Sequence, residues 1–430
     1  MSFLRTDDEL ARHSYYNATA SRTHGFGTLR SSVDCDVAVV GGGLAGLSAA
    51  IELADRGYSV VVLEAQQVGW GASGRNGGQA LAGLACDQSV IEKQLGMEAA
   101  RRVWAMTLEA LDLIQQRCER FSIDCDWQPG YLSLATNARK AQELRASHSH
   151  LQAHYGDTST WINAQELPKW IASPRFHSGL YDARSGHLHP LKYSLGLARA
   201  AASVGVRIFE KSAVIALTQG PTAKLKTAHG EVRASHVLLA GNVYLQNLAP
   251  TLSPRIMPVG TYIVASEPIE PAVLHSLIPT RSAVCDTNFV LDYFRPTADH
   301  RMLYGGRVSY STATPRNLSA SMQKRMACTF PQLADTQVEF AWGGFVDISM
   351  NRAPDFGRIG TNVYYLQGFS GHGLALTGLA GKLVAEAIAG SAERFDLFAK
   401  LRHRSFPGGA LLRTPALMLG MAYYRLRDML

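Results

Sequence analysis

The 430-residue sequence has few of the features that mark exported, membrane-spanning or metal-binding proteins. Its six cysteines form no CxxC pair and no other metal-ligand spacing, a pattern that fits a reduced, cytoplasmic compartment and predicts no metal site. Residues 1–16 lack the apolar core of a signal peptide, and no apolar run reaches the length that spans a bilayer. We therefore expect neither export by this route nor a transmembrane segment.

A run of basic residues is also missing, although the formal net charge is +7. Lysines and arginines are scattered and are not interleaved with aromatic residues, so the charge predicts a solvated basic surface and no nucleic-acid partner. What the chain does have is length and 47% hydrophobic content, enough to bury a large core in two or three domains. Helical and strand patterns alternate along it, which favours an α/β fold.

A glycine-rich turn near the start of the chain carries the most specific signal. A β-branched run at 37–40 leads into Gly41-x-Gly43-x-x-Gly46, and a helical stretch rich in small residues follows. The first glycine allows a tight strand-to-helix turn, the second lets the backbone approach a pyrophosphate, and the third lets the helix pack closely on the sheet. A diphosphate then lies at the positive end of the helix. The pattern predicts dinucleotide binding, with a purely structural glycine-rich turn as the alternative.

An acidic residue stands where the ribose of a dinucleotide is expected. A second apolar strand, at 60–63, ends at Glu64, which is placed to accept a hydrogen bond from a ribose hydroxyl. Further cofactor contacts are expected from Leu44 and Ala45 at the start of the helix and from Ala65 beside the acid.

A second glycine-rich segment follows at 69–79. Its glycines let backbone amides crowd a ligand, and Arg75 or Asn76 can reach phosphate or ring oxygens. An ordinary flexible loop is the alternative. The residues expected to contact the cofactor are Gly71, Ala72, Ser73, Arg75, Asn76, Gly77, Gly78 and Gln79.

A third glycine-rich turn, at 368–373, follows an apolar strand and opens a helix that runs from about residue 374 to 389. The N–H groups of a helix N-terminus stabilise negative charge, and hydride transfer leaves such charge on one edge of a flavin. A plain strand-to-helix turn is the alternative. The expected cofactor contacts are Gly368, Ser370, Gly371, His372, Gly373 and Leu374.

Three separated segments therefore converge on one cofactor in this interpretation, whereas a nicotinamide dehydrogenase usually needs one contiguous fingerprint domain. A buried strand at 235–240 ends in Gly241, a crossing that is common where flavin proteins return to the nucleotide sheet. Val214 is a further expected contact. These patterns favour a permanently bound flavin dinucleotide over a nicotinamide.

The fingerprint, GWGASGRNGGQ at 69–79 and GFSGHG at 368–373 resemble the D-amino-acid oxidase/glycine oxidase superfamily of FAD enzymes. Within it, the chain is similar nearly end to end to the γ-glutamylputrescine oxidoreductase branch. The segments that carry this similarity are SYYNATA (14–20), IDCDWQPGYL (123–132), SGHLHPL (185–191), LDYFRPTADHRMLYGG (291–306), TFPQL (329–333) and FPGGALLRTPALMLGMAYYRLRD (406–428). The superfamily motifs are highly specific for FAD, whereas the branch has diversified over many amines.

The resemblance implies an α/β fold with a FAD-binding, Rossmann-like domain of the glutathione-reductase type. An α+β substrate domain, built on a mostly antiparallel sheet, is inserted into it. The expected FAD-binding segments are 34–90, 186–255 and 340–395. The expected substrate domain comprises 91–185 and 256–339, with an N-terminal arm at 1–33 and a C-terminal tail helix at 396–430.

The same resemblance implies flavin-dependent oxidation of the primary amine of a γ-glutamylated polyamine. A hydride passes from the carbon bearing the neutral amine to the flavin, and the imine hydrolyses to an aldehyde and ammonia. Oxygen recycles the flavin with release of hydrogen peroxide, or another acceptor takes its place. The amine has to bind uncharged in a partly desolvated, aromatic-lined cavity, because desolvation lowers the pKa of an ammonium group. The alternatives are a related flavin dehydrogenase, an amino- or imino-acid oxidase of the pipecolate, glycine or sarcosine type, and a flavin-binding scaffold without turnover.

Several residues of amino-acid-oxidising relatives are absent here. Sarcosine-oxidase-like relatives hold a substrate carboxylate with a lysine just after the third glycine turn, where this chain has Ala375. Arg75 is the only arginine at 57–100, so a second carboxylate-binding position is missing as well. The strand at 302–305 lacks the lysine that helps oxygen react in those relatives. No cysteine lies at 340–350, where some relatives attach the flavin, so we predict non-covalent FAD.

His372 is the first candidate for catalysis, as a contact of the cofactor or the substrate. A hydrogen-bonded structural histidine is the alternative. Tyr262 is the second candidate because its strand is expected to face the flavin ring, although core packing is the more common role of such a residue.

Other candidates are weaker. His187 and His189 share a face if their stretch is a strand, but no third metal ligand is evident nearby. Trp342 and Phe369 are candidates for the aromatic walls of the cavity, with ordinary core packing as the default. Arg307 and Arg352 are candidates for binding the glutamyl carboxylate, with a surface position as the default.

The tail at 411–430 is apolar with three interspersed arginines. We expect it to dock as a helix on the body of the protein. Peripheral contact with an anionic membrane surface is the alternative.

Overall fold

The computed structural model describes residues 11, 13–22, 25–309 and 317–407, and the strands within these ranges form two sheets. The first has eight strands in the order β16-β17-β10-β1-β2-β7, with β9 and β8 beside β10. Its strands are β1 (Ser32–Val40), β2 (Val60–Leu63), β7 (Arg207–Phe209), β8 (Ala216–Thr218), β9 (Ala223–Lys226), β10 (Glu231–Leu239), β16 (Asp355–Ile359) and β17 (Val363–Gln367).

The central strands of this sheet are parallel and buried. β2, β1, β10 and β17 run in the same direction, and residues 37–40 and 60–63 are almost inaccessible to solvent. Val37 and Val39 face a core shared with four helices, whereas Ala38 and Val40 face a second core that β9 helps to close. Because both faces are covered, the strands read as continuous apolar runs.

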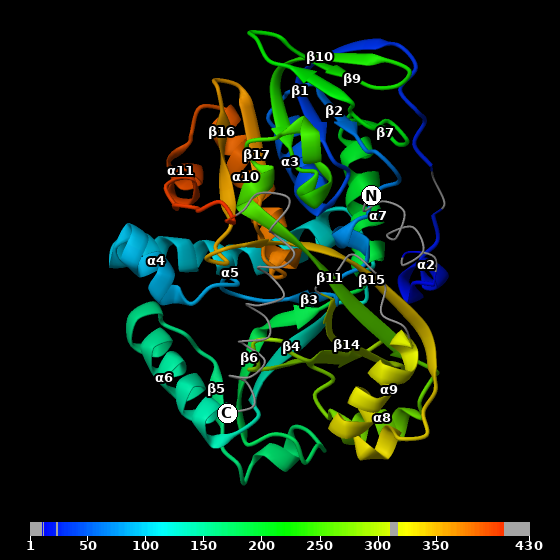
Figure 1. The fold of residues 1–430 in the computed structure, drawn as a ribbon, viewed down its shortest axis with the longest axis vertical. Helices are drawn as coiled ribbons and strands as arrows, with labels where there is room; N and C mark the ends of the chain where they lie inside the picture. The colour runs from blue at the N-terminus through cyan, green and yellow to red at the C-terminus, as the bar shows by residue number, and fades with distance from the viewer. Residues whose placement is uncertain (1–10, 12, 23–24, 310–316, 408–430) are drawn as a thin grey trace.

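Four of the helices that contribute to the first core are α3 (Leu44–Ala54), α5 (Met97–Arg120), α7 (Pro190–Ser203) and α10 (Gly373–Ile388). α3 and α10 are in direct contact, since a Cβ on Gly381 would lie 2.5 Å from the backbone nitrogen of Ala49. The sheet and these helices occupy the upper part of Figure 1.

The second sheet has nine strands in the order β15-β11-β14-β13-β12-β4-β6-β3, with β5 beside β6. Among the described pairs only β4 with β12 is parallel. Its strands are β3 (Gln79–Ala80), β4 (Gln128–Ala135), β5 (Thr160–Ile162), β6 (Ser178–His187), β11 (Ile256–Ser266), β12 (Ala283–Asp286), β13 (Tyr293–Pro296), β14 (Met302–Ser309) and β15 (Val338–Ser349).

One face of the second sheet packs on helices and the other faces the first core. Phe294 and Tyr304 stack with their ring centroids 5.4 Å apart in a core that includes residues of α8 and α9. Leu303 and Trp342 belong to the first core instead. Figure 1 shows α6, α8 and α9 at the lower end of the molecule. The remaining longer helices are α2 (Tyr15–Thr19), α4 (Gln88–Leu95), α6 (Ala138–Tyr155), α8 (Pro271–Leu277), α9 (Leu318–Thr329) and α11 (Glu393–Ala399).

The predicted α/β fold with a second, mostly antiparallel sheet is confirmed. The second sheet is inserted into the first along the chain, because β3 to β6 lie between β2 and β7 while β11 to β15 lie between β10 and β16. The chain therefore enters the first sheet three times, as expected from the sequence.

Three predicted boundaries do not follow the sheets and helices. β15 pairs with β11 from Ser349 to Val338 and belongs to the second sheet, although a boundary at residue 340 assigned most of it to the cofactor unit. α5, assigned to the substrate unit, contacts α3, where the Arg117 guanidinium donates to the Ser48 hydroxyl at 2.9 Å. α11 spans the boundary at residue 396. Local pattern specifies a strand or a helix but not the element against which it packs.

Both ends of the chain are described only in part. Within the N-terminal arm, α2 buries Tyr15 and Tyr16 against the body. Of the tail helix predicted at 396–430, residues 396–399 form the end of α11 and residues 400–407 are not helical, whereas the rest lies outside the described residues. In the part of the chain that the structure describes, no single helix is long and apolar enough to cross a membrane, and only α10 with α11, bent by 118°, reach that length and hydropathy together.

Candidate functional site

Four parallel strands of the first sheet end at the same edge, where residues assigned to the cofactor follow them. Gly41 follows β1, Glu64 follows β2, Gly368 follows β17, and Gly241 comes two residues after β10. The strand registers align these ends, and a Cβ on Gly41 would lie 2.6 Å from the carbonyl oxygen of Ala240. The first and third glycine-rich segments thus meet at one edge although more than three hundred residues separate them.

The fingerprint turn leaves backbone donors free at the start of α3. Gly41 has a φ of 113°, which favours glycine. A Cβ on Gly46 would lie 2.1 Å from the carbonyl oxygen of Gly41, so the third glycine lets the helix approach the turn. Among the described residues, the N–H groups of Gly43, Ala45 and Gly46 donate to no acceptor. Free donors at a helix N-terminus are suited to a phosphate.

Glu64 is fixed beside this helix start. Its Oε2 accepts from the N–H of Gly42 at 2.7 Å and its Oε1 from the N–H of Gln66 at 2.8 Å. Burial raises the pKa of the Glu64 carboxyl group. Val214 lies nearby along the chain, two residues after Ser212, whose N–H donates to the Glu64 carbonyl at 2.8 Å. This is the place that the ribose-binding acid of a dinucleotide site occupies.

The second glycine-rich segment contacts the first through Ser73. Its hydroxyl accepts from the N–H of Leu44 at 3.0 Å and would lie 2.7 Å from a Cβ on Gly43. Asn76 closes the loop itself, because its amide donates to the carbonyls of residues 72 and 73 and its Oδ1 accepts from the N–H of Gly78 at 2.8 Å. The loop is thereby held against the start of α3, and the polar atoms of Asn76 bind loop backbone.

Arg75 connects this loop to the second sheet. Its side chain is buried, with Nη1 donating to the carbonyl of Gly343 at 3.1 Å and Nη2 to the hydroxyl of Tyr244 at 3.3 Å. The guanidinium lies 4.6 Å from the ring centroid of Trp70. The carbonyl of Arg75 accepts from the indole N–H of Trp342 at 3.0 Å. Arg75 and Trp342 therefore join the loop to β15.

The last residues of the same segment pack on the second sheet as well. A Cβ on Gly77 would lie 2.6 Å from the ring of Tyr293, and one on Gly78 would lie 2.2 Å from the carbonyl oxygen of Leu188. The side-chain amide of Gln79 donates to a carbonyl of β12 at 3.1 Å. Protein neighbours alone thus require glycine at 77 and 78.

The third segment is held by Asp347, a residue that sequence reasoning missed. Its carboxylate accepts from the N–H of Gly368, and its carbonyl accepts from the N–H of Ser370 at 3.0 Å. Burial raises the pKa of Asp347 to about 7. The turn leads into α10, and in the described part of the chain the N–H groups of Gly373 and Leu374 have no acceptor. The only sequence signal was an acid that follows an apolar run near the end of β15.

His372 ties the third segment to the chain that follows the second. Its Nε2 lies 3.0 Å from the carbonyl oxygen of Ala82, so this nitrogen carries the proton and donates. Burial lowers the pKa of His372, which keeps the ring neutral at physiological pH. This bond supports the structural alternative for its side chain, while its position as the N-cap of α10 keeps it at the predicted flavin edge.

Comparison with known proteins identifies the family. The sequence model of a family described as "FAD dependent oxidoreductase" matches residues 36–387. The chain is 43% identical over 418 residues to the γ-glutamylputrescine oxidoreductase of Escherichia coli K12, covering 97% of this chain and 98% of that protein. It is 40% identical to the probable oxidoreductase OrdL of Haemophilus influenzae, covering 96% and 97%. The chain belongs to this family of FAD-dependent oxidoreductases.

Two solved structures have the same fold. The crystal structure of glycine oxidase from Geobacillus kaustophilus superposes with a TM-score of 0.70, covering 83% of this chain and 95% of that one at 24% identity. The L-proline dehydrogenase from P. horikoshii gives a TM-score of 0.71 at 20% identity, covering 87% and 98%.

The residues of this FAD-dependent oxidoreductase fit its cofactor. Unpaired N–H groups at the starts of α3 and α10 are donors suited to a diphosphate and to a flavin carbonyl, and Glu64 can accept further hydrogen bonds from hydroxyls. At the start of α3, Gly43 and Gly46 leave no room for a side chain. FAD, when bound, accepts a hydride and so oxidises a C–H bond next to nitrogen.

The remaining predicted residues lie in varied places. Tyr262 is buried in β11 with its ring 2.8 Å from a Cβ on Gly343. Phe369 packs on Phe356, their ring centroids 5.5 Å apart. The other predicted positions are Leu44 and Ala45 in the first turn of α3, Gly71 and Ala72 at the 3₁₀ turn of the second segment, Gly371 and Ala65 exposed, Arg307 in β14, and Arg352 with its guanidinium 5.4 Å from the ring centroid of Phe289.

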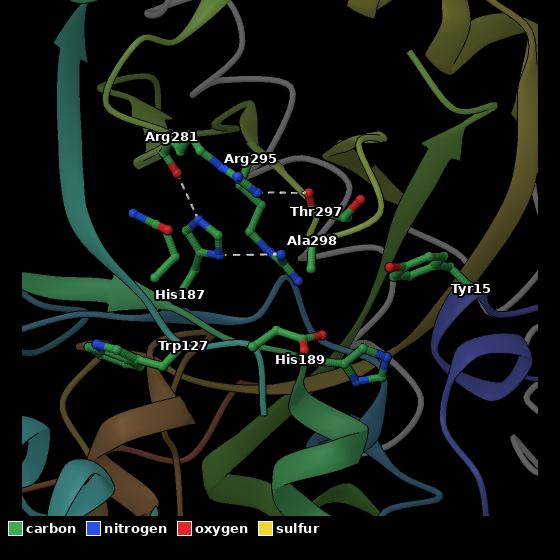
Figure 2. A pocket seen from close by; sticks show the side chains of 10 residues that line it. Tyr15, Trp127, His187, His189, Arg281, Arg295, Thr297 and Ala298 are labelled. Carbon is green, nitrogen blue, oxygen red and sulfur yellow. Dashed lines mark hydrogen bonds between the residues drawn. The ribbon is translucent and has the colours of Figure 1, made fainter. Parts of the chain in front are cut away.

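A cavity of about 140 Å³ opens beside the second segment, and sequence reasoning did not identify it. Figure 2 shows that aromatic, histidine and arginine side chains point into it from several elements. The residues that line it include Tyr15, Trp127, His187, His189, Arg281 and Arg295. His187 ends β6 and His189 is the N-cap of α7, so they lie on no common strand. Within the described residues, no group of three metal-ligating side chains is present.

Proposed function

We propose that this protein oxidises the terminal primary amine of a γ-glutamylated polyamine. The observation that supports this substrate is the 43% identity to γ-glutamylputrescine oxidoreductase, which extends over 97% of the chain. Because the similarity covers both sheets, it includes the segments that would bind substrate as well as those that would bind FAD.

The overall reaction is R–CH2–NH2 + O2 + H2O → R–CHO + NH3 + H2O2. A hydride, which carries two electrons, leaves the carbon that bears the amine, and a proton leaves the nitrogen. Water hydrolyses the resulting imine, and oxygen takes up the two electrons and two protons as hydrogen peroxide. The protein has to bind the amine uncharged and out of water, because an ammonium group has no lone pair with which to stabilise the developing imine. The N–H groups that open α10 would stabilise the negative charge that develops on the flavin.

The site supports an amine over an α-amino acid. Ala375, at the position of the carboxylate-binding lysine of sarcosine-oxidase-like relatives, is buried and apolar within α10. No lysine occurs in β14, where those relatives have one that helps oxygen react. An electron acceptor other than oxygen is therefore the alternative version of this proposal. FAD binds without a covalent bond in either form, since β15 contains no cysteine.

We further propose a cytoplasmic location. All six cysteines lie within the described residues and are free thiols, as expected in a reducing compartment.

Anaerobic flavin reduction tests the substrate. The purified holoenzyme is mixed under nitrogen with γ-glutamylputrescine, γ-glutamylspermidine, putrescine, glycine, sarcosine or pipecolate, and bleaching of the flavin band is followed in a stopped-flow instrument. The γ-glutamylated amines are expected to reduce the flavin at least a hundredfold faster than putrescine. Equal or faster reduction by sarcosine, glycine or pipecolate would replace the amine with an amino acid as the substrate.

Two further measurements test the cofactor and the acceptor. Acid precipitation should release all yellow colour into the supernatant if FAD is non-covalent. Peroxide formed per aldehyde should be one if oxygen is the acceptor, and well below one, with faster turnover on an artificial quinone, if it is not.

A further inference from the structure

The cavity beside the second glycine segment contains a buried arginine whose partners are all neutral. Arg295, the third residue of β13, is 3% exposed. Its Nε donates to the carbonyl of Gly77 at 2.7 Å. Its Nη2 donates to the carbonyl of Leu188 and the hydroxyl of Tyr16, each at 3.1 Å, and its Nη1 to the Nδ1 of His187 at 3.3 Å.

No carboxylate among the described residues lies within ion-pair distance of Arg295. Two carboxylates in this region are already paired: Asp126, on the cavity wall, lies 2.9 Å from Lys192, and Asp299 lies 2.9 Å from Arg301. A buried charge is normally paired, because burial without a counter-charge costs several kcal/mol. The cavity therefore has an excess of positive charge.

A second guanidinium increases this excess. Arg281 lines the same cavity and donates to the carbonyl of Thr297 at 3.3 Å, and within the described residues it too has no carboxylate partner. Figure 2 shows Arg281 and Arg295 on the same side of the cavity, above His187 and His189. The Arg281 carbonyl accepts from the Nε2 of His187 at 2.9 Å.

The two histidines add no charge. Burial, followed by the nearby Arg295, lowers the pKa of His187 well below its usual value and that of His189 to about 3. The hydrogen bonds agree with neutral rings, since the Nδ1 of His187 accepts from Arg295 and the Nδ1 of His189 accepts from the N–H of Lys192 at 3.2 Å. The arginines alone therefore set the sign of the potential in the cavity.

The cavity volume fits a small organic anion. A cavity of about 150 Å³ in a protein core holds a benzene molecule, which has six heavy atoms. The 140 Å³ present here matches a group of similar size, such as the α-amino-carboxylate end of a glutamyl group. The planar guanidinium of Arg281 can bind a carboxylate through paired hydrogen bonds. Arg295 gives all five of its N–H groups to protein acceptors, the fifth to the carbonyl of Pro296 at 3.5 Å, so it contributes positive charge alone.

We propose that this cavity binds the carboxylate of a small molecule, with Arg295 and Arg281 as its counter-charges. The carboxylate belongs either to the glutamyl end of the amine substrate, which rests on the proposed function, or to a free amino acid or dicarboxylate. Arg295 also donates to Gly77 in the predicted flavin loop. A ligand in the cavity would therefore change the environment of the cofactor.

Two matched ligands test the proposal on the holoenzyme without any substitution. N-butyl-γ-glutamylamide carries the carboxylate but no oxidisable amine, and its α-methyl ester lacks only the negative charge. Calorimetry should show the acid binding at least tenfold more tightly than the ester. Equal affinities of the acid and the ester would overturn the proposal. It would also be overturned if none of the amide acid, L-glutamate and glutarate binds. Because calorimetry needs no turnover, this result is separate from any failure of amine oxidation.

Competition distinguishes the two sources of the carboxylate. If the glutamyl end of the substrate occupies the cavity, the amide acid raises the KM for γ-glutamylputrescine and L-glutamate binds much more weakly. If a free carboxylate occupies it, L-glutamate or glutarate binds at least as tightly as the amide acid without raising that KM, and the flavin absorption band shifts on binding.

Substitutions then identify the counter-charges. Arg281→Gln is the first variant, because Arg281 does not contact the flavin loop, and it should reduce the preference for the acid at least threefold. Arg295→Gln should abolish the preference, provided that FAD content and Tm show that the protein is folded. Arg184→Gln is the control, since Arg184 is exposed and pairs with Asp112. An unchanged preference in folded Arg281→Gln and Arg295→Gln variants would show that these arginines do not bind the carboxylate.

Discussion

Asp347 is a buried carboxyl group on which the third glycine turn depends. Its pKa is raised from the ordinary value near 4 to about 7, so between these pH values the native state holds a proton that the unfolded chain has lost. Stability therefore falls as the pH rises from about 4 to about 7, by on the order of a few kcal/mol. Asp347→Asn should remove this part of the pH dependence while keeping an acceptor for the N–H of Gly368.

Thermal unfolding from pH 4 to pH 8 measures this effect. The Tm of Asp347→Asn minus the Tm of the native protein should increase as the pH rises. The control is Asp112→Asn, because Asp112 is exposed and paired with Arg184. A difference in Tm that stays constant with pH would show that Asp347 titrates normally.

Glu64 should determine the affinity for FAD. A hydrogen bond from a ribose hydroxyl to a carboxylate contributes roughly 1.5–3 kcal/mol, which corresponds to about a tenfold to hundredfold change in Kd. Glu64→Gln removes the charge with little change in shape, so the Kd for FAD should rise by this factor. Titration of the apoprotein with FAD, followed by flavin fluorescence, measures it.

Glu143 provides the matched control. It is exposed on α6 and pairs with Arg139, so Glu143→Gln should leave the Kd for FAD unchanged. Equal FAD affinity of Glu64→Gln and the native protein would remove Glu64 from the cofactor site.

Single residues also show where sequence reasoning stops. Glu64 was predictable because the fingerprint places an acid after the second strand of such a fold. Asp347 and Arg295 were not predictable. The roles of an acid in an apolar strand and of an arginine before a proline depend on their tertiary contacts. The role of Arg295 depends on the absence of a nearby carboxylate, which no local pattern records.

At the scale of elements, the contact between α3 and α10 sets the distance between the two helix starts that face the cofactor. A Cβ on Gly381 would lie 2.5 Å from Ala49 and 2.6 Å from the Cβ of Ser48, so Gly381→Ala has to push the helices apart. We expect a loss of about 1–3 kcal/mol in stability and weaker FAD binding. Urea unfolding and FAD titration measure the two effects.

Gly378, one turn earlier on the same helix, is the matched control. A Cβ there would lie 3.1 Å from the end of the Arg117 side chain and 3.7 Å from the Cδ2 of Leu113, and it would contact no backbone atom of α3. Gly378→Ala should therefore be neutral or stabilise the protein by up to about 1 kcal/mol through helix propensity. Equal effects of the two substitutions would mean that helix contact does not control the site.

Elements with a strong local pattern were predicted well. The buried strands at 37–40 and 60–63 and the helix that opens after Gly43 have apolar periodicity and glycine spacing that leave few alternatives. The expected boundary at residue 340 falls inside β15, which lies in the second sheet. Its pairing with β11 is a long-range contact that the two segments' sequences do not specify.

At the scale of the whole molecule, the cofactor site is made of chain segments that belong to different parts of the sequence. Individual hydrogen bonds join these segments. The N–H of Leu44, at the start of α3, donates to the Ser73 hydroxyl in the second glycine-rich segment, and His372, at the start of α10, donates to the Ala82 carbonyl. FAD should add contacts to all three at once. Its binding is therefore expected to raise Tm in proportion to the logarithm of its concentration above Kd.

Hydrogen exchange of the apoprotein and holoprotein tests whether the three segments act together. Amides at 41–46, 71–79 and 368–375 should all exchange more slowly with FAD, because a ligand that bridges them suppresses their separate opening. Exchange in α6, on the far side of the second sheet, is the internal control and should not change. Slowing confined to 41–46 would mean that the dinucleotide contacts the fingerprint alone, and the convergence of the glycine turns would then serve only to pack the two sheets.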